Sequence, residues 1–208
     1  MLPAKTVERL SAYRRTLDLF SKNGTQFVFS HDLAARLNLT PVQVRRDLML
    51  IGYSGQIRKG YHVTELRNHI SETIDSHLAI NIAIFGIGDL GKALAGYFMG
   101  KHNKMNLVAA FDIDPNKVGK VIAGVKCYHL SEINQKVKEL NLSIALLTVP
   151  TNVAEQVAEI IVLSGIKGIM NYTTVPLTVT SEVCLEEYDM ITSLEKLVFF
   201  VKTKNKKL

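Results

Sequence analysis

The stretch Ile80-Asn-Ile-Ala-Ile-Phe-Gly-Ile-Gly-Asp-Leu-Gly91 decides the fold of most of this chain. Its first six residues form the short apolar run of a buried strand, and a helical pattern follows the glycines. Gly86 allows a tight turn, Gly88 lets the backbone approach a pyrophosphate, and Gly91 permits close packing of helix on strand. Asp112 ends the next strand, 21 residues after Gly91, where a carboxylate can bind ribose hydroxyls. The spacing predicts a dinucleotide site of the Rossmann type.

The acids around this fingerprint refine the expected cofactor. A carboxylate at Asp112 repels a 2′-phosphate and no arginine stands nearby, so NAD(H) is expected rather than NADP(H). Asp89, beside Leu90, places a negative charge near the proposed pyrophosphate, where it either caps the helix or weakens binding. Asp114 precedes a proline, so it is either a cofactor contact or the start of a turn.

Apolar strands alternate with helical stretches throughout residues 78–175. Such repeated β-α-β units indicate a parallel sheet flanked by helices, an α/β fold. The expected strands after the first are 107–111, 125–128, 144–149 and 166–170, with helices at 131–140 and 152–164.

The charge is concentrated at the N-terminal end. Residues 1–60 hold 10 basic and 4 acidic side chains, whereas residues 61–208 hold 15 of each, and all eight arginines lie at or before Arg67. Arginine is the preferred donor for phosphates and guanine edges. The first third of the chain therefore predicts a polyanionic partner.

The pattern within this basic region predicts a winged helix-turn-helix. An amphipathic helix ends at Asn23-Gly24, and a short helix over 31–37 follows with Ser30 as its N-cap. Thr40-Pro41-Val42-Gln43 then reads as a capping box opening a third helix, and residues 52–60 as a hairpin tip. The alternative is an ordinary three-helix bundle with a basic face. The expected DNA-binding residues on the third helix and the wing are Thr40, Gln43, Arg45, Arg46, Arg58 and Lys59.

The last segment, from Met190 to about Lys202, predicts a helix with more apolar surface than a lone terminal helix should display. We expect it to be buried against a second subunit. No apolar run is long enough for a transmembrane helix, and the N-terminus lacks the apolar core of a signal peptide. The cysteines, Cys127 and Cys184, are far apart, which favours reduced thiols in a cytoplasmic protein with no metal site.

Together these pieces resemble the Rex family of redox-sensing transcriptional repressors over essentially the whole chain. The resemblance implies a homodimer that binds a palindromic operator and is released by NADH, with NAD⁺ competing. It implies a winged-helix domain with connector over residues 1–77, an NAD(H)-binding Rossmann domain over 78–189, and a domain-swapped C-terminal dimerisation helix over 190–208. The matching stretches are Val42-Gln-Val-Arg-Arg-Asp-Leu48, Gly86-Ile-Gly-Asp-Leu-Gly-Lys-Ala-Leu-Ala95, Ala110-Phe-Asp-Ile-Asp-Pro-Asn-Lys-Val-Gly119, Ala145-Leu-Leu-Thr-Val-Pro150 and Gly165-Ile-Lys-Gly-Ile-Met-Asn171.

The same resemblance assigns further residues. It places Thr148, Val149, Pro150, Asn171 and Tyr172 at the nicotinamide end of the cofactor. It also implies an intersubunit switch made by Arg15, Tyr97 and Asp189. The sequence departs from the family pattern at the wing, at Asp89 and in the segment after Asn171.

Two other classes of function remain as alternatives. A small NAD-dependent oxidoreductase is disfavoured because only about 33 residues follow the Rossmann core, too few for a substrate domain. No histidine, Tyr–Lys pair or nucleophilic cysteine stands out for hydride chemistry, so no catalytic residue is assigned. A nucleotide- or CoA-binding interaction module is opposed by the asymmetric arginines and the capped third helix.

Overall fold

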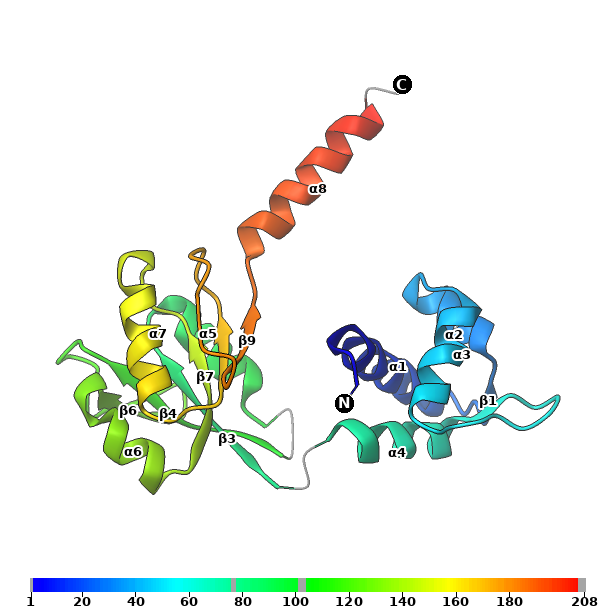
Figure 1. Cartoon of the computed structure of the whole chain (residues 1–208), viewed down its shortest axis with the longest axis horizontal. Coiled ribbons are helices and arrows are strands. Elements are labelled where there is room, and N and C mark those ends of the chain that lie inside the picture. The colour runs from blue at the N-terminus through cyan, green and yellow to red at the C-terminus, as the bar shows by residue number, and fades with distance from the viewer. Residues whose placement is uncertain (1, 76–77, 101–103, 206–208) are drawn as a thin grey trace. The chain divides into compact units, whose positions relative to one another are not determined.

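The computed structural model describes residues 2–75, 78–100 and 104–205. It divides the chain into two compact units, Met1–His77 and Leu78–Leu208 (Figure 1).

The N-terminal unit is a winged helix-turn-helix. Its helices are α1 (Ala4–Lys22), α2 (Ser30–Leu37), α3 (Pro41–Leu50) and α4 (Val63–Ile74), and β1 (Phe27–Val28) pairs antiparallel with β2 (Tyr61–His62). The core is formed by fully buried side chains, among them Leu10, Tyr13 and Leu17 of α1 and Leu66 and Ile70 of α4. Helices α1, α2 and α3 confirm the helical pattern expected from the sequence.

Two local details differ from the sequence expectation. Ser30 does not cap α2 but is its first residue. The backbone N–H of Phe29 donates to the Asp32 carboxylate at 2.7 Å, so the helix starts one residue earlier than predicted. The strand β1 was not predicted, because two residues carry no periodicity and its pairing with β2 is long-range.

The C-terminal unit is built on one seven-stranded sheet, in the order β5-β6-β4-β3-β7-β8-β9. All neighbouring strands run parallel except β5 and β6. Without the antiparallel edge strand, the order is that of a doubly wound dinucleotide-binding sheet, which confirms the predicted α/β class. The strands are β3 (Ile80–Phe85), β4 (Met105–Asp112), β5 (Val121–Ile122), β6 (Val125–His129), β7 (Leu142–Leu147), β8 (Gly168–Asn171) and β9 (Cys184–Glu187).

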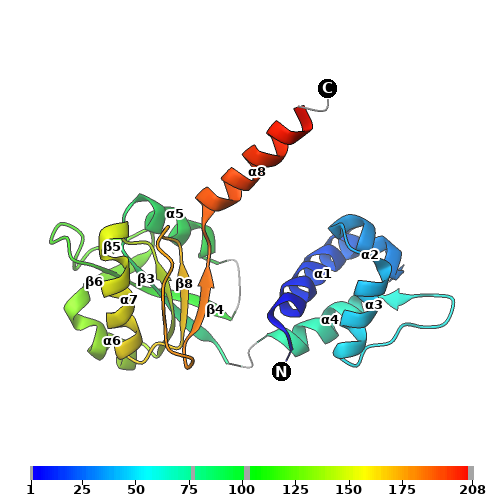
Figure 2. The same cartoon turned by 45° about the horizontal axis from the view of Figure 1, so that its top comes forward.

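Helices cover both faces of this sheet because successive strand residues point to opposite sides. Phe85 and Ala83 of β3 belong to the core with α6 (Ile133–Glu139) and α7 (Ala154–Leu163). Ile84, between them, belongs to the core with α5 (Asp89–Phe98) on the other face (Figure 2). Two 3₁₀ turns, Leu130–Glu132 and Thr151–Val153, precede α6 and α7. The sheet is therefore the middle of three layers, with α6 and α7 on one face and α5 on the other.

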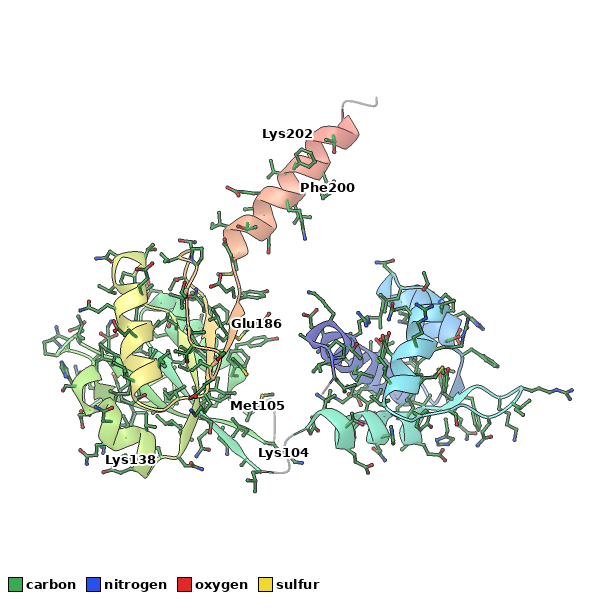
Figure 3. All side chains as sticks on the ribbon, in the orientation of Figure 1. Lys104, Met105, Lys138, Glu186, Phe200 and Lys202 are labelled. Atoms are coloured by element: carbon green, nitrogen blue, oxygen red, sulfur yellow. The ribbon has the colours of Figure 1, made fainter. Side chains whose placement is uncertain are left out.

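The last helix, α8 (Met190–Asn205), differs from all the others in its burial. Every side chain described on it, from Met190 to Thr203, is exposed. Phe200, labelled in Figure 3, is 54% exposed. Within the described residues, no helix is long and apolar enough to cross a membrane.

Candidate functional site

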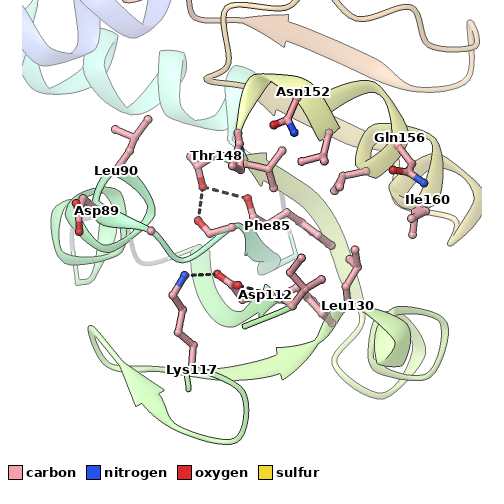
Figure 4. Close-up of a pocket in the computed structure, with 18 residues that line it drawn as sticks. Phe85, Asp89, Leu90, Asp112, Lys117, Leu130, Thr148, Asn152, Gln156 and Ile160 are labelled. Carbon is pink, nitrogen blue, oxygen red and sulfur yellow. Dashed lines mark hydrogen bonds and ion pairs between the residues drawn. The ribbon is translucent and has the colours of Figure 1, made fainter. Parts of the chain in front are cut away.

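A cavity of about 750 Å³ opens at the carboxyl ends of β3, β4 and β7 (Figure 4). This is the point where the strand order reverses, and doubly wound sheets bind their ligands there. Among the predicted residues that line it are Gly86, Gly88, Asp89, Leu90, Asp112, Thr148, Val149 and Pro150.

The three fingerprint glycines have different surroundings. A Cβ on Gly86, whose φ is +91°, would lie 2.9 Å from the Thr148 carbonyl oxygen. A Cβ on Gly91 would collide with the Gly86 carbonyl oxygen, so Gly91 allows the helix to approach the turn. A Cβ on Gly88 would meet no atom within 4 Å. Gly88 also lines the cavity, so of these three glycines it is the one where a Cβ would be free of protein contacts at the cavity wall.

The Thr148 hydroxyl is committed to the architecture of this loop. Its Oγ1 donates to the Gly86 carbonyl oxygen at 2.7 Å, with the Phe85 oxygen at 3.1 Å. These bonds hold the end of β7 against the glycine turn, as the dashed lines of Figure 4 show. Thr148 therefore shapes the cavity, while Val149 and Pro150 continue its wall.

Asp112 lies at the base of the cavity and is already fully engaged. Its Oδ1 accepts from the backbone N–H groups of Ile113 and Asp114, both at 2.9 Å. Its Oδ2 accepts from the Ile87 N–H at 3.0 Å and from the Lys117 ammonium at 2.9 Å. Burial alone would raise the pKa of the Asp112 carboxyl, but these bonds outweigh it and the pKa lies below its ordinary value. The carboxylate is thus held ionised, with Lys117 as its counter-ion.

The other two acids near the fingerprint have separate roles. Asp114 does not line the cavity, and its Oδ1 accepts the Asn116 N–H at 2.9 Å, which favours the turn interpretation. Asp89 has a fully exposed side chain that lies 3.6 Å from the Lys92 ammonium. It is the first residue of α5, whose N-cap is Gly88, so Asp89 does not cap the helix.

Asn171 and Tyr172 lie outside the residues that line the cavity. Asn171 is 1% exposed, and its amide is used internally: Nδ2 donates to the Val175 oxygen, and Oδ1 accepts from the N–H and hydroxyl of Thr173. Tyr172 packs edge-to-face on Tyr188 with 5.4 Å between ring centroids. Burial first, then the neighbouring Tyr188 and Tyr97, raises the pKa of Tyr172. In this structure Asn171 and Tyr172 therefore shape the loop after β8.

Several lining residues were missed by the sequence analysis. Lys117 lies five residues after Asp112, and no signal but its position in the turn after β4 marked it. The remaining wall is mostly apolar and comes from 3₁₀ turns and from α7, whose residues face the cavity only because of the tertiary packing. These residues are Leu130, Asn152, Val153, Gln156, Val157 and Ile160.

The N-terminal unit exposes the predicted cations on α3 and on the wing. Arg45 and Arg46 are exposed, and Arg45 donates to the Ser30 hydroxyl at 3.0 Å, joining α3 to α2. Arg58 and Lys59 are exposed at the hairpin, where a backbone hydrogen bond of 2.7 Å from Gln56 to Gly60 closes the turn. Arg58 has a φ of +67°, a left-handed conformation that suits the tip of a tight turn.

Three of the arginines form ion pairs with carboxylates of the same unit. Arg9 pairs with Asp47, Arg14 with Asp75, and Arg67 with Asp18. No ion pair joins Arg36, Arg45, Arg46 or Arg58 to a carboxylate in the part of the chain that the structure describes. Among the described residues Arg15 of α1 also lacks an ion pair, so the arginines available to a polyanion lie on α1, α2, α3 and the wing, most of them on the last three.

The predicted capping box at α3 is half correct. The Thr40 hydroxyl accepts from the Gln43 N–H at 3.1 Å, as expected for an N-cap. The Gln43 side chain, however, does not reach back to Thr40, because its Nε2 donates to Asp47 Oδ1 at 3.0 Å. In a capping box the Gln43 Oε1 would accept the Thr40 N–H, whereas here the Gln43 side chain is held instead by a charge-assisted hydrogen bond from its Nε2 to the buried Asp47 carboxylate.

The three predicted switch residues each have local contacts. Arg15 is exposed on α1 and donates to the Ser11 hydroxyl at 3.0 Å. Tyr97 lies on α5, edge-to-face with Phe98. Asp189 caps α8: its Oδ1 accepts the N–H groups of Ile191 and Thr192 at 2.8 and 3.1 Å. A switch that recruits Asp189 would have to release this cap.

Comparison with known proteins places both units in one context. A family model described as "CoA binding domain" matches residues 77–175, and one described as "Putative DNA-binding protein N-terminus" matches residues 1–48. A redox-sensing transcriptional repressor Rex of Geobacillus kaustophilus (strain HTA426) is 35% identical over 201 residues, 97% of this chain and 94% of that protein.

Solved structures match equally completely. The crystal structure of RSP in complex with β-NAD⁺ and operator DNA is 29% identical with a TM-score of 0.91, covering 99% of this chain and 94% of that one. The crystal structure of RSP with β-NADH is 27% identical with a TM-score of 0.86, covering 99% and 96%. RSP is described as a Rex-family repressor.

Proposed function

The chain belongs to the Rex family of redox-sensing transcriptional repressors, and from this premise we propose that it represses transcription by binding operator DNA until NADH releases it. The family is one of repressors, not of enzymes, so the oxidoreductase alternative is set aside. One observation carries the proposal. A repressor that matches this chain over almost its whole length has been crystallised with NAD⁺ and operator DNA and also with NADH.

The cavity fits a dinucleotide on the chain's own geometry. Gly88 leaves open space beside the N-terminus of α5, where backbone N–H groups and the helix dipole favour a pyrophosphate. The apolar wall from α7 suits an adenine ring, and Val149 and Pro150 would face the nicotinamide. The bound cofactor supplies a ring whose charge differs between NAD⁺ and NADH.

Asp112 and Lys117 together set the ribose end of the site. Asp112 already accepts four hydrogen bonds, as many as a carboxylate can take. A ribose hydroxyl would therefore replace one of them, and the Lys117 ammonium is the donor most easily moved. We expect Asp112→Ala to weaken NADH more than NADPH, since the released Lys117 can then bind a 2′-phosphate. Equal affinities of the wild-type chain for the two cofactors would contradict this assignment.

DNA would be read by α3 and the wing. Arg45 and Arg46 would enter the major groove or clamp its edge, and Arg58 and Lys59 would reach the minor groove. Supporting this, all four are exposed on one winged helix-turn-helix unit. Thr40 would act chiefly by opening the helix, since its hydroxyl is the N-cap of α3.

We propose that the active form is a homodimer in which α8 is exchanged between subunits. The exposed apolar side chains of α8 support a second copy as its partner. A palindromic operator then provides one half-site for each winged helix. Arg15, Tyr97 and Asp189 are proposed to make or break a subunit contact as the cofactor changes. Acting on bacterial DNA, the dimer would work in the cytoplasm without a metal.

The decisive experiment measures operator affinity at fixed salt without cofactor, with NAD⁺ and with NADH. NADH should weaken operator binding by about 5- to 150-fold, the usual range for such coupling, and saturating operator should weaken NADH binding by the same factor. Three equal operator affinities would leave a DNA-binding protein with a structural dinucleotide.

A glycine variant tests the cofactor site separately. Gly88→Val should abolish NADH binding while preserving the fold, because Gly88 lines the cavity and a Cβ there would meet no protein atom within 4 Å. Gly96→Val is the matched control, since that position on α5 is also free of neighbours but does not line the cavity. NADH binding by Gly88→Val at wild-type affinity would contradict the site.

A further inference from the structure

Asp47 is a fully buried carboxylate on the inner face of α3, with 0% of its surface exposed. Its Oδ2 accepts from Arg9 Nε at 2.6 Å and from the Tyr13 hydroxyl at 2.7 Å. Its Oδ1 accepts from Arg9 Nη2 at 2.7 Å and from Gln43 Nε2 at 3.0 Å. Two side chains of α1 therefore hold Asp47, and Asp47 in turn holds Gln43 one turn earlier on α3.

The chemistry of this contact determines which way the Gln43 amide points. Burial alone would raise the pKa of the Asp47 carboxyl, but hydrogen bonds from Arg9, Tyr13 and Gln43 lower it below its ordinary value. An ionised carboxylate only accepts hydrogen bonds, so the Gln43 amide must turn its nitrogen inward. The Gln43 Oε1 accepts no hydrogen bond within the described part of the unit.

Gln43 stands at the edge between the core and the exposed face of α3. It is half-buried, in the first turn of the helix, whereas Arg45 and Arg46 are exposed. Residues in the first turns of a recognition helix are the ones that meet base edges. Gln43 thus keeps an acceptor oxygen that accepts no hydrogen bond from the described residues, two and three positions before the exposed Arg45 and Arg46.

We propose that Asp47 is a specificity-determining positioning residue, which orients the Gln43 amide so that its oxygen accepts a hydrogen bond from a base in the major groove. This inference rests on the proposed DNA-binding function and adds the partner atom. The donors that bases present in the major groove are the exocyclic amines, adenine N6 and cytosine N4. The second N–H of Gln43 Nε2 stays free to donate to adenine N7.

The probe for the test is a duplex selected by the full-length wild-type chain from random-sequence DNA. Each base pair of a half-site is substituted in turn, and affinity is measured at fixed salt for the wild type and Gln43→Ala. We expect Gln43→Ala to flatten the preference at one position. At that position, replacing adenine by purine, or cytosine by 2-pyrimidinone, deletes the amine and should cost the wild type at least about 5-fold, the lower end of a good side-chain–base contact.

Asp47→Asn then tests the positioning role. Asparagine keeps the shape but can donate to Gln43, so the Gln43 amide is free to turn over. The variant should lose the same base preference as Gln43→Ala, and the double variant should lose no more than either. The salt dependence should stay at the wild-type slope, because no cation that contacts phosphate is removed. A general loss of structure would not produce this selective pattern.

Thr6→Val is the matched control within the same network. Its hydroxyl accepts from Arg9 Nη2 at 3.2 Å but does not touch Gln43, so its loss should leave base preference unchanged. The inference is overturned if Asp47→Asn keeps the wild-type preference, or if deleting the amine leaves wild-type affinity unchanged. Should Asp47→Asn fail to fold, the Gln43→Ala and amine-deletion measurements can still overturn the inference, because it requires the Gln43 oxygen to contact a base amine. A wild-type chain that selects no DNA would refute the proposed function itself.

Discussion

Two amphipathic helices, α1 near one end of the chain and α8 near the other, differ in burial: α1 buries large apolar side chains, whereas those of α8 are exposed. Leu10, Tyr13 and Leu17 of α1 are 0% exposed. Leu194 and Leu197 of α8 are 58% and 60% exposed. Both helices carry apolar residues at helical spacing, so the difference does not lie in local sequence.

The difference lies in what each unit offers as a partner. The N-terminal unit supplies α4, which packs against α1 through Leu66 and Ile70. No described element of the chain buries a side chain of α8. Burying a large apolar side chain is worth about 1.5–3 kcal/mol, so α8 gains this stabilisation only from a second surface. A helix that is stabilised only by a second surface is suited to subunit assembly, whereas α1 is stabilised by packing within its own unit.

Deletion of residues 190–208 should have the largest effect, because it removes α8 altogether. Without α8 the chain should be monomeric or aggregated and should lose operator binding, because a single half-site binds weakly. Sedimentation and retardation of a palindromic duplex measure both effects. A soluble, dimeric truncation that still binds DNA would contradict the assignment of α8.

Leu10→Ala tests whether α1 is stabilised within its own unit. It removes a fully buried side chain and should lower the free energy of unfolding by about 2–5 kcal/mol, the usual cost of a large-to-small change in a core. The loss should be the same at every protein concentration in denaturant titrations. A loss that grows on dilution would mean that α1, too, is completed by another subunit.

Leu197→Ala is the same change on α8 and should act differently. It should raise the dimer dissociation constant by about 10-fold or more, corresponding to roughly 1.4 kcal/mol of lost burial. The thermal midpoint should fall only over concentrations at which the dimer dissociates. Lys196→Ala, at the adjacent position, is the control, and equal effects of the two variants would argue against an apolar interface.

Lowering the pH should have the smallest effect of these changes. It acts on two carboxylates, one that contacts α1 and one that caps α8. Asp47 ties α1 to α3 and Asp189 caps α8, and hydrogen bonds hold the pKa of each below its ordinary value of 3.8. A lowered carboxyl pKa stabilises the fold above the ordinary pKa and loses this contribution as the pH falls through the lowered one. The N-terminal unit should therefore lose stability below about pH 4, and Asp47→Asn should lessen that pH dependence. For Asp189, which is half-buried, only a slight loss of helix content in α8 is expected, seen by circular dichroism.

The cofactor region illustrates how far sequence reasoning reached. The glycine turn, the strand before it and the acid at the end of the next strand lie in short segments of fixed spacing, so Gly86, Gly88 and Asp112 could be predicted to share one edge of the sheet. Lys117 and the α7 wall could not, because their place at the cavity depends on how a turn and a helix pack. Asn171 and Tyr172 were grouped with the cavity by resemblance, yet they do not line it.

The recognition helix shows the same limit at one side chain. Thr40 and Pro41 open α3 through local backbone chemistry, which the sequence alone predicts. Gln43 has the right position for a capping box, but its amide turns to Asp47, a charge that Arg9 and Tyr13 bring within the core. The local rule failed because the buried Asp47 carboxylate, held by a long-range ion pair with Arg9, binds the Gln43 amide N–H and draws the side chain away from the Thr40 N–H.

The sequence alone predicts the two-part architecture, the class of cofactor and the basic character of the DNA-reading unit. It could do so because periodicity, glycine spacing and charge distribution act over a few residues and survive any packing. Only the tertiary structure decided which arginines are neutralised inside, which donor balances Asp112, and which way the Gln43 amide points. Each of these depends on groups far apart in the chain, whose burial makes one hydrogen-bond partner much stronger than the alternatives.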